Sequence, residues 1–395
     1  MKNLFFFLFI FSSCISNNTR IQQQEENLPI TEPPYTISLE KEIDNIQSVD
    51  LTEIGDTIIY IPLETNDLSL LKDLMQIIVT NSYIVVRDAD NILMFDSSGH
   101  FLRQIGRRGQ GPGEYKNILD YCFSSDNNYI YLLTTFYQCL EFNVEGKFMK
   151  SFKIDSMPSQ MLPSKEDLFA FHCINAPGYV NPTKQSLIIS DLNNNIQKTY
   201  ENYHKRTKQP GITISRVPFY YHQGTMRFKE FGVDTLYTIT EEKLIPHAIF
   251  NLGSKELPAD LQSPLMEFKK TIKENYAGKY TIVNLLEDDD NIYIRLSDYF
   301  DDLYGYYNKP NNNVKIIGEQ GFQNNIDGGL PFIPRYVYND SILVDYVNAF
   351  TLREHVLKSN ATEMKRLYGQ KYDDLVKLVN SLDDESNPVV VMVKK

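Results

Sequence analysis

A short hairpin-like motif that recurs at a fixed distance constrains the fold more than any other feature of the sequence. The first copy is Phe95-Asp96-Ser97-Ser98-Gly99-His100-Phe101, and Phe142-Asn143-Val144-Glu145-Gly146-Lys147-Phe148 follows 47 residues later. Both phenylalanines and the glycine coincide, and each glycine lies in a polar turn where a positive φ is often needed. A chain that repeats one hairpin in this way is expected to fold as a series of similar units.

Each of the first two units contains four strand-like segments separated by short turns rich in Asn, Asp, Ser and Gly. The strands are predicted at residues 74–80, 82–86, 91–95 and 100–105, and then at 118–123, 129–134, 138–142 and 147–154. Weaker copies follow at residues 187–191, 235–239 and 303–307. Four strands per unit and a period of roughly 50 residues are typical of β-propeller blades.

The later units carry helical insertions and a closing strand. Residues 263–277 are predicted to form an amphipathic helix, which accounts for the longer interval before the fifth copy, and a second helix is predicted over residues 362–382. The last unit has strand-like residues 334–338 and 341–344.

The apolar strand predicted at residues 389–393 ends the chain. Because a propeller seals its sheet edges, we expect this strand to pair with residues 57–61 in the sixth blade. The predicted fold class is therefore all-β, a six-bladed β-propeller of four-stranded antiparallel blades with an inserted helix and a C-terminal helix.

A glycine-rich segment separates the first two units: Gly106-Arg107-Arg108-Gly109-Gln110-Gly111-Pro112-Gly113-Glu114-Tyr115. It admits two interpretations, a shaped turn between blades or an anion site in which Arg107 and Arg108 act beside exposed backbone N–H groups. The segment lacks the Lys-Ser/Thr pair of a P-loop, and a strand rather than a helix follows it. These departures favour the turn.

The run from Asp90 to Tyr115 resembles an NHL-type repeat, and the whole chain resembles the six-bladed β-propeller lipoproteins of bacterial outer membranes. The likeness is specific over residues 70–155, becomes diffuse over 156–340, and returns in the closing Asn387-Pro388-Val389 segment. The resemblance implies a six-bladed propeller on a lipid anchor, and it implies no established catalytic residue.

The N-terminus has the features of a secretory leader. Lys2 precedes an apolar run at residues 4–11 that is too short to span a bilayer, and Ser12-Ser13-Cys14 follows. Small residues before a cysteine resemble a bacterial lipobox, although Phe11 stands where an aliphatic residue is usual. We therefore predict a lipoprotein signal peptide at 1–13, lipidation of Cys14 at the outer membrane, on its periplasmic or outer side, a flexible tether at 14–35 and the propeller at 36–395. The alternative is a cleaved leader with an incidental cysteine.

Composition limits the partners and the chemistry. The net charge of −12 argues against nucleic acid as a partner. Cys122, Cys139 and Cys173 lie in apolar contexts and are predicted to be buried thiols. No motif indicates a cofactor or a metal, and the six histidines are each predicted to be surface or loop residues: His100, His172, His204, His222, His247 and His355.

An acidic run at residues 287–290, with Asp298, Asp301 and Asp302, could supply oxygen ligands to calcium, but it lacks the spacing of an EF-hand. A solvated turn between strands is the favoured interpretation.

Two runs rich in aromatic and polar residues are candidates for ligand recognition. One contains Tyr220, Tyr221 and His222, and the other contains Tyr304 and Tyr306. Tyrosine offers a flat apolar face and a hydroxyl, which suits sugar rings or peptide side chains. Ordinary packing within the blades is the alternative.

The sequence favours a binding or scaffold module of the cell envelope, with a glycan, a peptide or an envelope protein as its ligand, because a repeat fold appears without a catalytic motif. The alternative is a propeller hydrolase or lyase acting on glycans or peptides, whose residues converge on the central funnel from several blades and so escape linear motifs.

Overall fold

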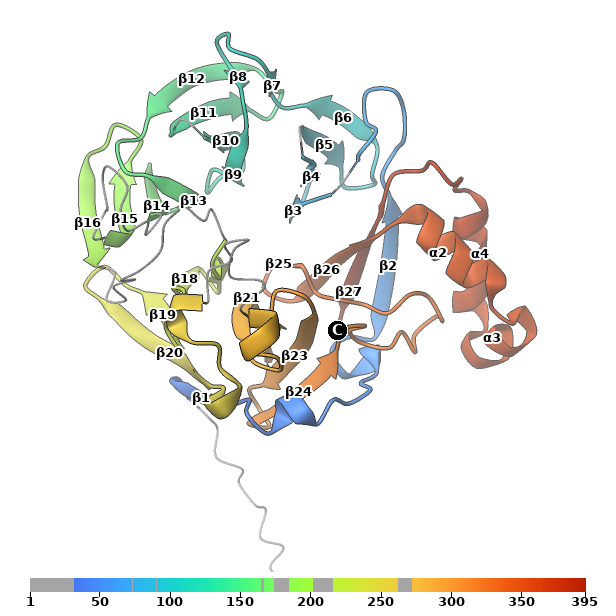
Figure 1. Ribbon diagram of the computed structural model, residues 1–395. Helices are drawn as coiled ribbons and strands as arrows, with labels where there is room; N and C mark the ends of the chain where they lie inside the picture. Colours follow the sequence, from blue (N-terminus) through green and yellow to red (C-terminus); the bar gives the residue numbers. More distant parts are fainter. Residues whose placement is uncertain are drawn as a thin grey trace, which may run out of the picture. The chain divides into compact units, whose positions relative to one another are not determined.

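The computed structural model describes residues 32–72, 74–89, 91–135, 137–164, 167–173, 185–201, 216–261 and 272–395. This part of the chain forms six small sheets arranged in a ring, which Figure 1 shows along the ring axis. The four consecutive strands of each blade pair antiparallel, as expected from the short polar turns between them. The predicted six-bladed β-propeller is confirmed.

The blades follow the chain in order. The first blade contains β3 (Gln76–Val79), β4 (Tyr83–Arg87), β5 (Ile92–Asp96) and β6 (Phe101–Gln104), and the second contains β9 (Ile118–Phe123), β10 (Tyr129–Thr134), β11 (Gln138–Asn143) and β12 (Phe148–Lys153). The third contains β13 (Pro158–Pro163), β14 (Leu168–Cys173), β15 (Gln185–Asp191) and β16 (Ile196–Glu201). The fourth contains β17 (Phe219–His222), β18 (Thr225–Phe228), β19 (Thr235–Ile239) and β20 (Leu244–Asn251), and the fifth contains β21 (Thr281–Glu287), β22 (Asn291–Ser297), β23 (Asp302–Asn308) and β24 (Asn313–Gly318).

The sixth blade joins the two ends of the described chain. It contains β25 (Tyr336–Tyr338), β26 (Ile342–Val347), β27 (Val389–Lys394) and, as its outer strand, β2 (Thr57–Pro62). Strands β2 and β27 are antiparallel, with Ile58 opposite Val393 and Ile61 opposite Val390. The predicted closure of the ring is confirmed.

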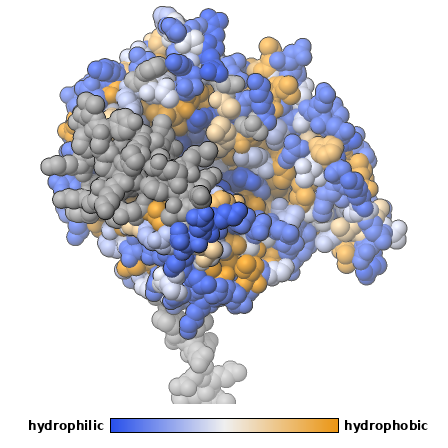
Figure 2. Space-filling model, viewed as in Figure 1, coloured by the Kyte–Doolittle hydropathy of each residue, from blue (hydrophilic) through white to orange (hydrophobic). Residues whose placement is uncertain are grey.

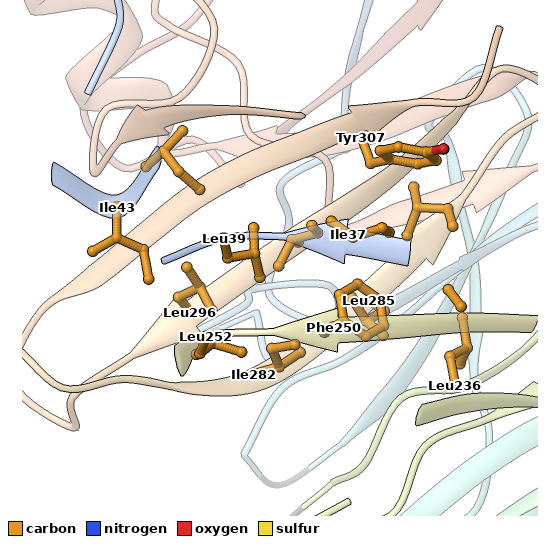
Figure 3. Close-up of a cluster of buried hydrophobic side chains, with 14 of the residues drawn as sticks. Ile37, Leu39, Ile43, Leu236, Phe250, Leu252, Ile282, Leu285, Leu296 and Tyr307 are labelled. Atoms are coloured by element: carbon orange, nitrogen blue, oxygen red, sulfur yellow. The ribbon is translucent and has the colours of Figure 1, made fainter. Parts of the chain in front are cut away.

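The face of the molecule seen in Figure 2 is mainly hydrophilic, with hydrophobic residues scattered among the polar ones. The apolar side chains are instead concentrated between adjacent blades. Figure 3 shows one such core, where Phe250 of the fourth blade lies near Leu285 and Tyr307 of the fifth. Burial of these large side chains between sheets holds each blade to the next.

A fifth strand on the fourth blade was not predicted. Strand β1 (Tyr35–Ser38) runs parallel to β20 on its outer edge, with Ile37 opposite Phe250. Ile37 is fully buried in the core of Figure 3. This strand covers an edge that would otherwise be exposed.

Three helices precede the closing strand, where one had been predicted over residues 362–382. They are α2 (Ala349–Lys358), α3 (Ala361–Tyr368) and α4 (Gln370–Asn380), drawn beside the ring in Figure 1. Gly369 has a φ of 59°, which ends α3 and separates it from α4. The predicted C-terminal helical segment is confirmed, but Gly369 divides it into two helices and α2 precedes them. Of the helix predicted at 263–277, residues 272–275 are helical and residues 262–271 lie outside the described part.

Candidate functional site

The innermost strands of the six blades, β3, β9, β13, β17, β21 and β25, surround a central cavity of about 1010 Å³. Each of these strands contributes side chains to the wall. In propellers the axis of the ring is where residues from every blade meet. A large cavity lined by residues from every blade is a natural candidate for a ligand site.

Hydrogen bonds between blades show that the inner strands all run the same way along the channel. At the end where they begin, the amide Nε2 of Gln76 donates to Asp120 at 3.2 Å, and Gln160 bonds to the backbone of Val217. We call this end the proximal mouth. At the other end, the distal mouth, the Tyr221 hydroxyl donates to the carbonyl of Pro163, and Gln223 donates to Asp289 at 2.8 Å.

The proximal mouth carries a buried aspartate held by an arginine. Asp120 on β9 is 2% exposed, and Nη1 of Arg216 donates to its Oδ1 at 2.6 Å. Its Oδ2 accepts the N–H of Met161 at 2.9 Å. Gln160 exchanges two hydrogen bonds with the backbone of Val217, at 2.6 and 3.2 Å, and so fixes the residue next to Arg216.

A second group of side chains lies between the fifth and sixth blades at the same mouth. Nε of Arg335 donates to buried Asp345 at 2.7 Å, and its guanidinium lies 4.8 Å from the centre of the Tyr346 ring. In the fifth blade, Arg295 donates to Asp302 through both Nε and Nη2, at 3.0 and 2.5 Å. Both arginines line the cavity.

Each of these two arginines lies over a tyrosine ring. The Arg295 guanidinium lies 6.0 Å from the centre of the Tyr304 ring, and Tyr304 and Tyr346 both line the cavity. Burial raises the pKa of Tyr304 and of Tyr346, while the charges of Arg295 and Arg335 act to lower both. Because the charges of both arginines act on both phenols, the four side chains lie close together in one cluster.

The distal mouth contains a buried carboxylate among cations. Glu287 is 1% exposed and accepts from His247 Nε2 at 2.9 Å, Lys309 Nζ at 3.0 Å and Arg227 Nε at 3.2 Å. Burial alone would raise its pKa, but the bond from His247 and the charges of these neighbours outweigh burial and lower the pKa to about 2. Glu287 is therefore ionised throughout the physiological range.

Another buried polar network links the third and fourth blades. Ser159 Oγ lies 2.8 Å from His172 Nδ1, and His172 Nε2 lies 3.4 Å from Glu230. All three side chains are buried, and none of them lines the cavity. A serine, a histidine and a carboxylate in contact can form a nucleophile, but here they are enclosed in the interface between blades and join them.

These networks correct the prediction that every histidine is a surface or loop residue. His172, His222 and His247 are buried within strands, whereas His100 is exposed and His355 is partly buried. His204 lies outside the described residues. Their strands pack against other blades, and single-sequence patterns do not show which face of a blade a lone histidine occupies.

The channel brings together some of the predicted recognition residues and not others. Tyr220, Tyr221 and Tyr304 line the cavity, and His222 lies beside it, with Nδ1 3.5 Å from Asp340 Oδ1. Tyr306 faces the core between blades, where its hydroxyl donates to Glu53 at 2.6 Å. Ligand binding by any of them stays a prediction.

Arg107 and Arg108 are exposed in the glycine-rich segment and do not line the cavity. They form β7 (Arg107–Arg108), which pairs with β8 (Glu114–Tyr115) in a small parallel ribbon between the first two blades. The Glu114 carboxylate accepts the N–H groups of Gln110 and Gly111 at 2.9 and 2.8 Å and Nε of Arg107 at 2.6 Å. The backbone donors of the alternative anion cradle thus bind a carboxylate of the protein itself.

The acidic run at 287–290 is only partly a solvated turn. Glu287 and Asp288 are buried, and the Asp288 carboxylate accepts from Tyr293 at 2.6 Å. Asp302 binds Arg295 instead of joining this run. Among the described residues, no three His, Cys, Asp or Glu side chains are grouped so that they could hold a metal ion.

The prediction for the cysteines is confirmed: Cys122, Cys139 and Cys173 are free and buried. Burial raises the pKa of the Cys173 thiol to about 12, so it is protonated at neutral pH. Cys14 lies outside the described residues.

Sequence reasoning missed the arginines and the aspartate of the proximal mouth. Arg216 and Arg335 stand immediately before inner-strand regions, in Arg216-Val217-Pro218 and Pro334-Arg335-Tyr336. Once the blades had been assigned, an arginine at the start of a blade's first strand would have indicated Arg216 and Arg335.

The family described as domain of unknown function DUF4934 matches residues 34–394 of this sequence. The chain belongs to this family. A search of curated proteins gives no match to this DUF4934 chain.

This DUF4934 propeller is similar to several solved structures, of which one supports its fold along nearly the whole chain. A candidate exported protein from Bacteroides fragilis has a TM-score of 0.67 at 16% identity, over 91% of this chain and 99% of that one. A propeller domain of Cps50 (Swd1) from Myceliophthora thermophila has a TM-score of 0.36 at 9% identity, covering 64% and 91% of the two chains. A Bacteroides caccae protein of unknown function has a TM-score of 0.33 at 11% identity, covering 54% and 66%. The first of these shows a shared fold along nearly the whole chain.

In the described part of this DUF4934 chain, no helix has both the length and the apolar character needed to cross a membrane.

Proposed function

We propose that this protein is a binding module of the cell envelope, carried by a lipid on Cys14 at the outer membrane, and that a glycan or a peptide binds at the proximal mouth of its channel. The observation that carries this proposal is the channel of about 1010 Å³, whose mouth presents Arg216, Arg295 and Arg335 beside tyrosine rings. Pockets that combine flat apolar faces with a few fixed polar groups are typical of ligand sites.

Two similarities support the envelope location. The Bacteroides fragilis protein of the same fold is named as a candidate for export, and the sequence resembles propeller lipoproteins of bacterial outer membranes. A lipid-modified cysteine followed by a polar tether would hold the propeller at the membrane surface and leave the channel open to solvent.

The side-chain pairing at the mouth supports binding over acid–base catalysis. Asp120, Asp302 and Asp345 each accept a hydrogen bond from an arginine. A carboxylate engaged in this way orients a donor for a ligand, whereas a general acid or base must be able to exchange its proton with the substrate.

The full chain, purified in detergent, is to be applied to arrays of immobilised glycans and peptides, and each compound that binds is to be incubated with the protein and checked for turnover. Asn284→Trp would place a large side chain in the wall of the mouth without removing any charge. We expect it to abolish binding. Met149→Trp, on the exposed outer strand β12, is the matched control and should bind normally.

Absence of binding to every glycan and peptide would refute the function. Equal binding by wild type and Asn284→Trp would place the site elsewhere, and turnover of a bound compound would establish the hydrolase or lyase alternative.

A further inference from the structure

We infer that the ligand of the proximal mouth is an acidic oligosaccharide whose carboxylates are bound by Arg216, Arg295 and Arg335. This inference rests on the proposed function and names the substrate class of the same site. It depends on three features of the mouth: the unused donors of its arginines, the way in which the arginines are held, and the tyrosine rings that two of them contact.

Each arginine donates only some of its guanidinium N–H groups to other residues of the protein. Arg216 uses Nη1 for Asp120 and, at 3.5 Å, for Gln76. Arg335 uses Nε for Asp345, and Arg295 uses Nε and Nη2 for one oxygen of Asp302. Within the residues that the structure describes, no acceptor contacts the remaining N–H groups of these three side chains. They are between 37% and 48% exposed and line the cavity. A guanidinium can bind a ligand carboxylate through two parallel hydrogen bonds.

The aspartates fix two of the arginines before a ligand arrives. Asp120 is itself held by the Met161 N–H at 2.9 Å, and Asp345 is held by the N–H groups of Ile333 and Tyr346 at 3.0 and 2.7 Å. Both carboxylates are buried. A side chain that is already oriented loses less conformational entropy on binding, so the arrangement favours a ligand that is itself charged.

The arrangement of the tyrosines favours a sugar chain over a peptide. The guanidinium groups of Arg295 and Arg335 lie over the rings of Tyr304 and Tyr346, so a sugar ring that packs against either pair meets a phenol ring and a guanidinium together. A sugar acid carries its carboxylate on the ring and can make both contacts at once. Arg216, from the segment between the third and fourth blades, lines the same cavity and could bind a carboxylate on another residue of the sugar chain. An acidic peptide carries its carboxylates on flexible side chains that have no such ring.

Calorimetry with three probes tests the inference: tetragalacturonate, its fully methyl-esterified form, and tetraglutamate. We expect tetragalacturonate to bind and the ester and the peptide not to. Arg295→Gln and Arg335→Gln should each weaken binding by about tenfold or more, since each removes a charge-assisted bidentate contact. Arg335→Lys should recover part of the affinity, because it keeps the charge. Arg366→Gln, on α3 outside the ring, should bind as wild type does.

Circular dichroism is used to verify that each variant is folded, and the lysine variant remains informative if a glutamine variant is not. The inference would be overturned if tetragalacturonate did not bind, if its ester bound equally well, or if tetraglutamate bound better. It would also be overturned if the folded arginine variants bound with unchanged affinity. If neutral glycans or peptides still bind and Asn284→Trp blocks them, the proposed function stands and only the acidic class is wrong.

Discussion

Ile61 of β2 lies opposite Val390 of β27, so one antiparallel pair joins the two ends of the described chain in a single blade. Just before this strand, the side chain of Asn387 binds three backbone groups of the loop that follows β2. Its Oδ1 accepts the N–H of Leu71 at 2.9 Å, and its Nδ2 donates to the carbonyls of Glu64 and Ser69 at 2.7 and 2.8 Å. The closing strand is therefore held by its ladder and by one buried amide.

Removing residues 387–395 should abolish cooperative unfolding, because it takes away a central strand of the sixth blade and opens the ring.

Asn387→Ala should lower the free energy of unfolding by about 2 to 4 kcal/mol, since several buried backbone groups lose their partner. Denaturant titration measures both effects. Asn360→Ala, which removes the exposed cap of α3, is the control and should cost about 1 kcal/mol. A truncated chain that unfolds like wild type would contradict this account of closure.

The repeats that could be predicted are those whose turns are short and well marked. Gly99 and Gly146 have φ values of 90° and 77°, and both belong to the repeated motif from which the blades were inferred. Strand β1 gave no comparable signal, because it has four residues and pairs with a strand more than 200 residues away. The helix boundary at Gly369 was missed because a lone glycine within an amphipathic pattern can either continue or end a helix.

The site was harder to predict than the fold. The proximal mouth is built from four separate segments, which carry Asp120, Arg216, Arg295 and Arg335. Only the closure of the ring brings these residues to one mouth. The runs that contain the tyrosines were recognisable because their aromatic residues lie close together in sequence. Tyr304 and Tyr306 are two residues apart and so lie on the same face of β23, where both pack against one core cluster. Only Tyr304 also lines the cavity, and position along a strand relative to the channel is not visible in the sequence.

The glycine-rich segment contains one position that should not accept a side chain. Gly113 has a φ of 74°, and a Cβ there would lie 2.7 Å from Cγ of Phe148. Gly113→Val should lower stability by about 1 to 3 kcal/mol because of backbone strain, with the aromatic contact adding to the loss. Gly111 has no positive φ, and its Cβ would meet the flexible end of Glu114 at 3.1 Å. Gly111→Ala should therefore cost less. Equal melting temperatures for the two variants would show that Gly113 is not constrained.

Anions should not stabilise this segment in the wild-type protein. Glu114 already accepts the N–H groups of Gln110 and Gly111, and these bonds and Arg107 lower its pKa, so it remains ionised at neutral pH. We expect sulfate to give the same shift in melting temperature for wild type and for the double variant Arg107→Ala, Arg108→Ala. A sulfate-dependent stabilisation that disappears only in the double variant would restore the anion-site interpretation.

Lipidation of Cys14 predicts how the protein divides between the membrane and soluble fractions of a cell lysate. If Cys14 carries the lipid, Cys14→Ala should move the protein from the membrane fraction to the soluble fraction, because the leader is too short to span a bilayer. Cys139→Ala, at a buried thiol of the second blade, is the control and should leave the protein in the membrane fraction. Immunoblots of both fractions measure the distribution. Retention of the Cys14 variant at the membrane would show that another feature holds the protein there.

Acid should weaken the fold through Glu287. The folded-state pKa of about 2 lies below the usual value of 4.5, so ionised Glu287 contributes stability above pH 4.5 and loses that contribution as the pH falls toward 2. The loss from this group should be about 3 kcal/mol. Glu287→Gln should flatten this part of the pH profile. At pH 7 it should cost about 3 to 5 kcal/mol, since the countercharge of buried Arg227 and Lys309 is removed.

Glu354→Gln is the matched control, because Glu354 forms an exposed pair with Lys358 on α2. It should change stability by less than about 0.5 kcal/mol at pH 7 and leave the acid profile intact. Chemical denaturation between pH 2 and pH 7 measures all three proteins. If Glu287→Gln kept the wild-type slope below pH 4.5, the acid sensitivity would belong to another buried carboxylate, and Glu230 would be the next to test, because its pKa is also lowered to about 2.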